Sequence, residues 1–184
     1  DIHVDIFIVE PTAERNYYTL VTSGMGAHRM NVPKELAEYK LERAEIVVYL
    51  PADWNISDHE EKNYWPLRWL KILARLPLEE DSWLGWGHSV PNGKPFAENT
   101  QLSSVLLINP ENVEEGAAVC QLPNGEEVNF YQMIPLYEEE VNFKIQNGAE
   151  TLLGKMGEIS AVVDIHRLNV CEGFGRSWDL CTVR

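Results

Sequence analysis

Alternating positions rich in β-branched and aromatic residues predict strands in the first part of the chain. Residues 3–9 and 17–23 have this pattern and flank a connection that contains Pro11, which predicts a hairpin-like pair of strands. The apolar run at residues 44–50 predicts a third strand, and Pro51 is expected to end it. The pattern therefore places three strands before the first long helix.

The hydrophobic period becomes helical between residues 64 and 76, which predicts an amphipathic helix. Its apolar stripe is formed by residues at helical spacing and two neighbours, namely Trp65, Trp69, Leu73, Leu76, Leu70 and Ile72. Pro66 is expected in the first turn, where no intrahelical N–H donor is required. The opposite face carries three cations, Arg68, Lys71 and Arg75. A solvated face paired with acids such as Glu79 or Glu80 is the simpler interpretation, and a partner-contacting row is the alternative.

The middle of the chain combines an unusual loop with a clear hairpin signal. Residues 82–99 are rich in Trp, Gly and Pro and predict a long loop that is either packed or functional. Residues 104–108 read as a buried strand. Residues 113–121 and 127–134 flank Pro123-Asn124-Gly125, and an Asn-Gly pair accepts the positive φ angles of a tight hairpin turn.

The last third of the sequence predicts two short helices and a final strand. After Pro135, the acids Glu138–Glu140 suit the first turn of a helix and read as surface, while Val141 and Ile145 begin its apolar face. A second short helix follows, and residues 161–170 read as a last strand. Together these elements predict an α+β fold, with one mixed, largely antiparallel sheet and flanking helices in a single domain that spans residues 1–184.

Composition and charge narrow the class of protein. The 184 residues are 45% apolar and 24% charged, as in ordinary soluble domains, and no apolar run approaches the length of a membrane span. The formal net charge of −14 repels phosphate backbones and anionic lipids. We therefore expect a cytoplasmic protein that binds neither nucleic acid nor membrane. The chain opens at Asp1, directly in a strand and without an initiator Met, which predicts a trimmed start.

The cysteines and histidines predict no metal or cofactor. Three cysteines at irregular spacing support neither a disulfide framework nor a four-cysteine zinc site. None of the five histidines has the spacing of a helical zinc site. An irregular site made of His166, Cys171 and Cys181 is the remaining metal alternative, beside ordinary packing.

Catalytic motifs are incomplete. Gly24-Met25-Gly26 follows a strand, but no third glycine arrives, so a tight structural turn is expected there instead of a phosphate loop. No serine lies in a Gly-x-Ser-x-Gly elbow, and no cysteine has an activating context. The chain is therefore predicted not to be an enzyme, with an uncharacterised hydrolase kept as an alternative.

Two tryptophans near glycines are the leading candidates for partner binding. Trp83, Trp86 and His88 lie in a loop outside the strand and helix periods, and Met25 is a lesser candidate in the Gly-Met-Gly turn. Large amphipathic rings in such positions can anchor a protein partner. The alternative is that they plug one end of the core.

Read together, five blocks of the sequence resemble a bacterial member of the suppressor of fused family: residues 1–7, 17–26, 31–33, 45–51 and 87–93. The likeness covers nearly the whole chain. It implies an α+β domain with a noncatalytic, protein-binding role. Animal members restrain Gli-type transcription factors, and bacterial relatives have been proposed as immunity proteins that neutralise toxins.

The resemblance has limits and adds two candidate residues. Animal members hold the partner's extended peptide between two lobes by strand addition, and 184 residues leave no room for the second lobe. Asp164 and Arg167 fall in the predicted last strand, where animal relatives have a similar Asp-x-x-Arg pattern near the cleft; an ion pair that ties the strand down is the alternative. The expected function is an immunity-type or partner-restraining protein, with another protein, such as a basic toxin, as its partner. A regulatory or adaptor domain without a toxin partner is the alternative.

Overall fold

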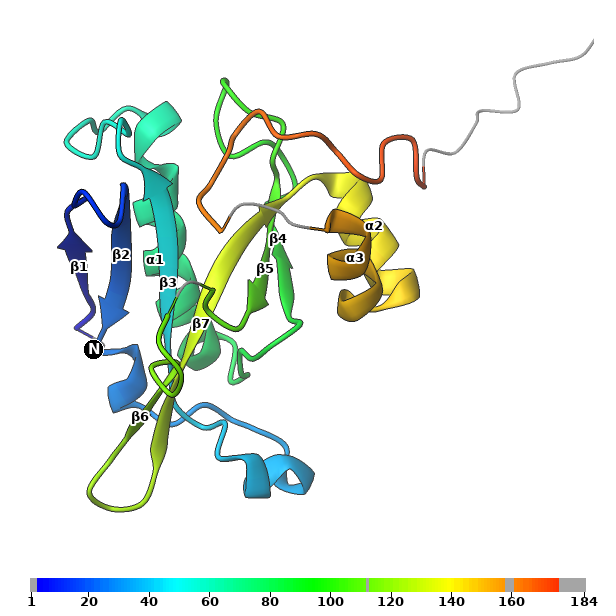
Figure 1. Ribbon diagram of the computed structural model, residues 1–184. Coiled ribbons are helices and arrows are strands. Elements are labelled where there is room, and N and C mark those ends of the chain that lie inside the picture. The colour runs from blue at the N-terminus through cyan, green and yellow to red at the C-terminus, as the bar shows by residue number, and fades with distance from the viewer. Residues whose placement is uncertain (1–2, 112, 158–160, 176–184) are drawn as a thin grey trace, which may run out of the picture.

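The computed structural model describes residues 3–111, 113–157 and 161–175. Its described part contains a seven-stranded sheet flanked by helices (Figure 1). The strands are β1 (Asp5–Val9), β2 (Tyr17–Ser23), β3 (Ala44–Pro51), β4 (Ser89–Pro91), β5 (Ser104–Ile108), β6 (Val119–Gln121) and β7 (Glu127–Leu136). Their order is β1-β2-β3-β7-β5-β4, and β6 also pairs with β7. Only the β3–β7 ladder is parallel among these pairs, so the predicted mixed, largely antiparallel α+β fold is confirmed.

The predicted hairpin-like pair of strands is confirmed, and the third strand extends it into an antiparallel meander. Phe7 lies opposite Val21 in the β1–β2 ladder, and Leu20 lies opposite Val48 in the β2–β3 ladder. Every residue of β3 before its terminal Pro51 is buried. This strand is therefore central to the sheet, which explains its nearly continuous apolar sequence.

Helix α1 (Glu61–Glu79) covers one face of the sheet with the predicted stripe. Trp65, Trp69 and Leu73 are buried, whereas Ile72 is exposed and does not support the stripe. The helix begins earlier than predicted, so Pro66 lies in its second turn. Pro66 has no N–H to donate to the Lys62 carbonyl, and the Asn99 side-chain amide donates to that oxygen instead, at 3.4 Å.

The basic row of α1 pairs within its own helix. Arg68 Nε donates to Glu61 at 2.7 Å, and Lys71 Nζ donates to the Tyr64 hydroxyl at 2.8 Å. Arg68, Lys71 and Arg75 are half-buried, and the partners of Arg68 and Lys71 lie at the start of the helix, not among the expected acids at its end.

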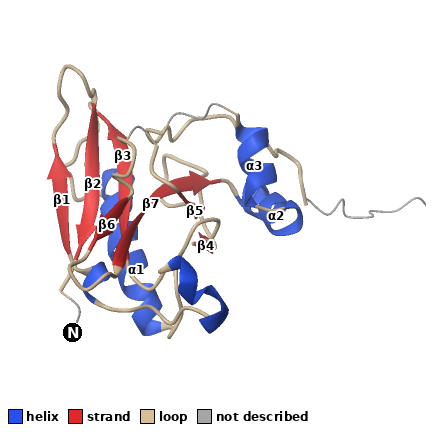
Figure 2. Cartoon of the chain, turned by 60° about the horizontal axis from the view of Figure 1, so that its bottom comes forward, coloured by secondary structure: helices blue, strands red, loops and turns tan. Residues whose placement is uncertain are grey.

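Helices cover the other face of the sheet over β5 and β7, and Ala161 packs on it against Val47 and Tyr49 of β3. The helices are α2 (Glu138–Asn147) and α3 (Ala149–Met156) (Figure 2), and their Val141, Leu152 and Met156 form a second buried cluster with residues of β5 and β7. Ile145 is 69% exposed, so the prediction that it begins the apolar face of α2 is wrong. Two short 3₁₀ helices, Met25–Ala27 and Lys34–Tyr39, precede β3.

Strand β7 joins the two halves of the sheet, and the sheet splits along its second half. Gln132 is paired with β3 on one edge and with β5 on the other. Beyond Gln132 the pairing with β5 continues to Leu136, while the pairing with β3 stops. The predicted hairpin around Gly125 is confirmed, although its first strand is shorter than 113–121.

Pro135 lies inside β7 and not before the next helix, because of this split. Ser103 N donates to the Leu136 carbonyl on the β5 side, so the carbonyl of Pro135 points to the opposite edge. An absent N–H at that edge costs no ladder hydrogen bond, which makes proline tolerable inside the strand.

Residues 161–170, here called the crossing segment, do not form the predicted strand. They make one isolated bridge, in which Val162 lies opposite Tyr49 and Val163 N donates to the Tyr49 carbonyl at 2.9 Å. The Gln132 side chain donates to the Ala161 carbonyl at 2.8 Å. The segment passes over the split between β3 and β7 and then turns, so it has no continuous strand edge to pair with (Figure 1).

Candidate protein-binding groove

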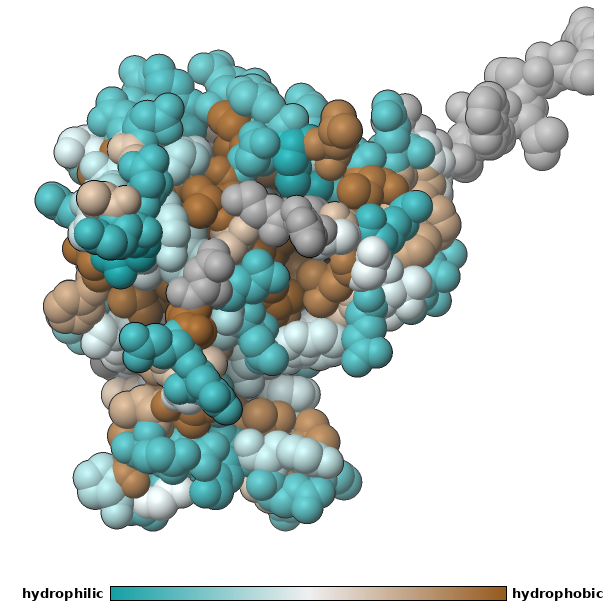
Figure 3. All heavy atoms as spheres, in the orientation of Figure 1, coloured by the Kyte–Doolittle hydropathy of each residue, from teal (hydrophilic) through white to brown (hydrophobic). Residues whose placement is uncertain are grey.

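Two cavities share lining residues of β7 and α3, and the crossing segment lines the larger of them. One measures about 490 Å³ and the other about 320 Å³, and both are lined by Ile134 and Met156. We call the two together the groove. In the view of Figure 3, apolar side chains gather around the middle of this face. The further apolar lining comes from strand, helix and crossing segment alike, including Leu102, Ile108, Leu153, Val163, Leu168 and Val170.

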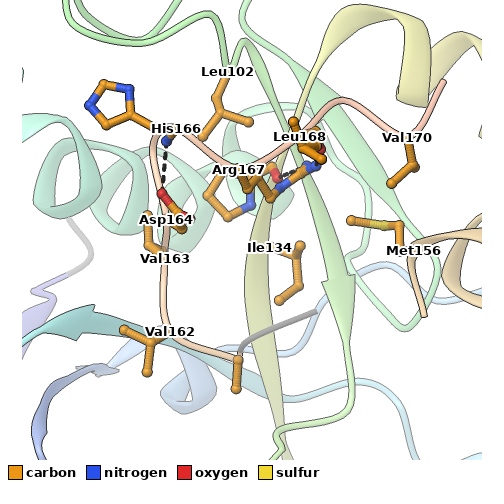
Figure 4. A pocket seen from close by; sticks show the side chains of 12 residues that line it. Leu102, Ile134, Met156, Val162, Val163, Asp164, His166, Arg167, Leu168 and Val170 are labelled. Atoms are coloured by element: carbon orange, nitrogen blue, oxygen red, sulfur yellow. Dashed lines mark hydrogen bonds between the residues drawn. The ribbon is translucent and has the colours of Figure 1, made fainter. Parts of the chain in front are cut away.

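A turn in the crossing segment forms the outer wall of the larger cavity (Figure 4). The carboxylate of Asp164 accepts a hydrogen bond from the backbone N–H of His166 at 2.9 Å, which fixes the turn. Asp164 and His166 are exposed, and Leu168 is 86% exposed. The candidate Asp164 therefore lies at the mouth of the cavity.

Arg167 is held by Glu140 and not by Asp164. Its two terminal nitrogens donate to the two carboxylate oxygens of Glu140 at 2.6 and 2.5 Å. The same guanidinium donates to the Pro135 carbonyl at 2.8 Å, on the open edge of β7. The Glu140 side chain is fully buried, so the expectation that Glu138–Glu140 are surface acids is wrong for this residue.

Backbone groups complete the surroundings of the buried carboxylate. The N–H groups of Tyr137 and Val170 both donate to Glu140, at 3.0 and 3.1 Å. The Tyr137 hydroxyl donates to the Arg167 carbonyl at 2.6 Å, and burial raises the pKa of that phenol. These contacts tie the crossing segment to the start of α2, so the wall of the groove is fixed from inside the protein.

Trp86 also contributes to the groove. It lines the smaller cavity together with Leu153 of α3, and its side chain is 40% exposed. Trp86 thus lines the smaller cavity of the groove and Asp164 the larger one.

Trp83 and His88 contact each other, with ring centroids 4.3 Å apart. Trp83 packs against the main core, and a Cβ on Gly85 would lie 2.6 Å from its ring, which explains this glycine. Burial lowers the pKa of His88, and the charge of Lys144 acts in the same direction. These surroundings fit packing better than exposed partner contacts.

Met25 is buried in the core, so its side chain is not available to a partner. The turn around it holds an internal anion. Glu45 accepts hydrogen bonds from the N–H groups of Gly24 and Gly26, both at 2.9 Å, and from the Thr22 hydroxyl at 2.6 Å. Because a carboxylate of the protein already occupies these donors, the turn is structural and not a phosphate loop.

In the part of the chain that the structure describes, no group of three His, Cys, Asp or Glu side chains is placed to hold a metal ion. Cys181 of the alternative metal site lies outside the described residues. Burial raises the thiol pKa of Cys171. Within the same described ranges, no helix is both long enough and apolar enough to cross a bilayer.

The sequence model of the suppressor of fused protein family (SUFU) matches residues 1–168. The chain belongs to the suppressor of fused family. A relative of this SUFU domain, an uncharacterized protein of Ureaplasma parvum serovar 3, is 28% identical over 167 residues, which are 90% of this chain and 78% of the relative.

Solved structures share the SUFU fold with this chain. A SUFU homologue from Neisseria gonorrhoeae FA 1090 has a TM-score of 0.64 and 20% identity, covering 91% of this chain and 78% of that one. The Sufu–Fu complex gives a TM-score of 0.63 at 14% identity, covering 91% and 76%. Drosophila Suppressor of Fused also gives 0.63, at 15% identity, covering 91% of this chain and 42% of its own.

Sequence reasoning missed two pairs in this SUFU domain. The ion pair of Glu140 could not be predicted, because the helix dipole already explains an acid in the first turn of a helix. Its partner, Arg167, follows 27 positions later in the sequence. Ser89 and Lys144 also come together, with Lys144 Nζ donating to the serine Oγ at 3.2 Å. Neither pair has a sequence motif, since each joins α2 to a distant segment.

Proposed function

We propose that this SUFU domain is a noncatalytic binding domain that holds one protein partner in the groove. The observation that carries the proposal is the groove itself, an apolar floor at Ile134 and Met156 with exposed Trp86 and Leu168 among its lining residues. Exposed large apolar side chains around a concave apolar site are typical of interaction hot spots.

The fixed wall of the groove supports this role. The ion pair between Arg167 and Glu140 and the hydrogen bonds of Gln132 position the crossing segment before any partner arrives. A preorganised site loses less conformational entropy on binding. Cavities of a few hundred Å³ suit one or two apolar side chains of a partner. The Sufu–Fu complex, a structure with this fold, supports a protein partner.

A partner-restraining role is our finer proposal. The net charge of −14 favours encounter with a basic protein, such as a toxin that itself acts on a polyanion. An immunity-type protein would combine this steering with a tight apolar contact. A regulatory or adaptor domain is the alternative, and a neighbouring gene for a secreted toxin distinguishes the two.

Site-specific photocrosslinking tests the binding site. A photoreactive phenylalanine analogue at position 168 should capture a partner that mass spectrometry identifies, and the purified partner can then be used in calorimetry. Trp86→Ala should weaken that complex by more than about 2 kcal/mol, mainly through faster dissociation. Tyr39→Ala, at an exposed aromatic residue outside the groove, is the control. Equal affinities of wild type, Trp86→Ala and Leu168→Ala would refute the groove as the binding site.

A hydrolase is the second candidate, and the contact between Ser89 and Lys144 is the observation in its favour. Burial lowers the pKa of Lys144, which favours the neutral amine that a serine–lysine pair requires. A fluorophosphonate probe should label Ser89 if the pair is catalytic, and Ser89→Ala should abolish labelling. Absence of labelling in the wild-type protein would remove this candidate.

A further inference from the structure

Strand β1 forms one outer edge of the sheet (Figure 1), and three consecutive apolar residues of this strand are exposed. Phe7 is 59% exposed, Ile8 43% and Val9 41%. β2 occupies one edge of β1, and no strand among the described residues pairs with the other. Such an edge offers a row of backbone N–H and C=O groups to another chain.

The two outer edges of the sheet differ in how they are protected. β4 is three residues long and ends in Pro91, and both features discourage pairing with another strand. β1 is five residues long and contains neither lysine nor proline. Since unprotected apolar edges promote association, β1 is suited to docking in a way that β4 is not.

The outward face of β1 adds an apolar contact to the free edge. Phe7 lies opposite Val21, and Val9 lies opposite Thr19. α1 packs on the other face of these strands, while α2 and α3 cover β5 and β7. A strand added beside β1 would therefore find backbone partners along its edge and apolar side chains on its face.

Acidic side chains flank this apolar strand. Asp5 stands at its start, and Glu10 and Glu14 follow its end, all exposed. Arg15 turns back to the hairpin, where it donates to the Glu10 carbonyl and lies over the Tyr17 ring. A second copy of this chain fits poorly, because it would bring the same acids to the same edge.

We propose that β1 binds an extended segment of a protein partner by strand addition, and that this segment alternates apolar and polar residues between flanking lysines or arginines. Main-chain hydrogen bonds supply affinity, alternate side chains contact Phe7 and Val9, and the basic flanks face Asp5 and Glu10. This surface is separate from the groove of the proposed function and does not depend on it.

A designed peptide tests the edge directly. The probe is an acetylated, amidated peptide of alternating threonine and valine between terminal lysines, compared with a version that ends in glutamates. We expect the lysine version to bind about 10-fold more tightly and the difference to shrink in about 0.5 M salt. Hydrogen exchange should slow in β1, and N-methylation of alternate peptide amides should abolish binding.

Charge-swapped variants provide the decisive comparison. Asp5→Lys together with Glu10→Lys should reverse the preference between the two peptides, whereas Glu79→Lys with Glu80→Lys, an equal charge change at the end of α1, should preserve it. Equal binding of the N-methylated peptide, protection at β4 instead of β1, or reversal by the control pair would overturn the proposal. Self-association that competes with the peptide would also overturn it, because the occupant would then be a second copy. Trp86→Ala should leave peptide binding unchanged, which separates this test from that of the groove.

Discussion

Arg167→Met removes the guanidinium that neutralises a fully buried carboxylate. The arginine side chain is 12% exposed, and it makes two short hydrogen bonds to Glu140 and a third to the Pro135 carbonyl. Methionine preserves much of the apolar stem but carries no charge. The substitution therefore leaves the buried carboxylate with its two backbone donors and no cation.

The expected loss follows from this geometry. Breaking a buried ion pair from one side costs about 3–5 kcal/mol. The N–H groups of Tyr137 and Val170 still bind Glu140 in the variant, which places the loss near the lower end, at about 3 kcal/mol. Because domains are stable by only about 5–15 kcal/mol, this is a large fraction of the total.

Urea unfolding monitored by tryptophan fluorescence measures the effect. At a slope of about 2 kcal/mol per molar urea, the midpoint should fall by about 1.5 M. Arg68→Met is the matched control, because the pair of Arg68 with Glu61 is partly solvated and should contribute less than about 1 kcal/mol. Adding Glu140→Gln to Arg167→Met should cost less than the sum of the two single changes, since the glutamine is neutral. Two results would show that the buried charge pair does not fix the crossing segment. One is strict additivity of the two losses of unfolding free energy in the double variant. The other is an equal loss of unfolding free energy in Arg167→Met and Arg68→Met.

Three further predictions concern other parts of the protein. Gly26→Ala should destabilise the fold by about 1–3 kcal/mol in the same urea assay, because its Cβ would lie 2.9 Å from Val128 Cγ1, while Gly154→Ala, with open space in α3, should not. Burial lowers the pKa of His88, so the unfolded chain binds a proton at this histidine more readily than the folded protein does. As the pH falls from the ordinary pKa of 6.5 to the folded value, the unfolding free energy should therefore decrease. The decrease should be larger for the wild type than for His88→Gln. Burial raises the pKa of Tyr131 to about 12, so a spectrophotometric titration should lose a late-ionising phenol in Tyr131→Phe.

The periodicity of apolar residues correctly predicted the helices and strands whose buried face is set by residue spacing along the chain. The strands at residues 5–9 and 17–23 and the stripe that includes Trp65 follow from residue spacing alone. The prediction failed at residues 161–170, where an apolar run resembles a strand but crosses a split in the sheet. It also misplaced Pro135, because only the tertiary structure shows which edge of β7 is open.

The candidate site was predicted only in part, for the same reason. Trp86 was proposed from the sequence as a side chain outside the core periodicities; it is exposed, and its role in binding stays a prediction. The floor of the groove was missed, since Ile134 and Met156 look like ordinary core positions until a strand and a helix bring them together. An ion pair that ties the segment of Arg167 down was the stated alternative, but its partner, Glu140, could not be named because it belongs to another element.

The parallel ladder between β3 and β7 has a consequence for how the chain folds. β1, β2 and β3 are consecutive, so their pairing requires only short loops to close. Pairing of β3 with β7 must wait until residues 52–126 have been looped out, which has a larger entropic cost and slows the search. We expect the early meander to form first, with β3 exposed on its inner edge until β7 arrives. During synthesis this buried, apolar strand would be the segment most vulnerable to misassociation, because its partner emerges from the ribosome much later.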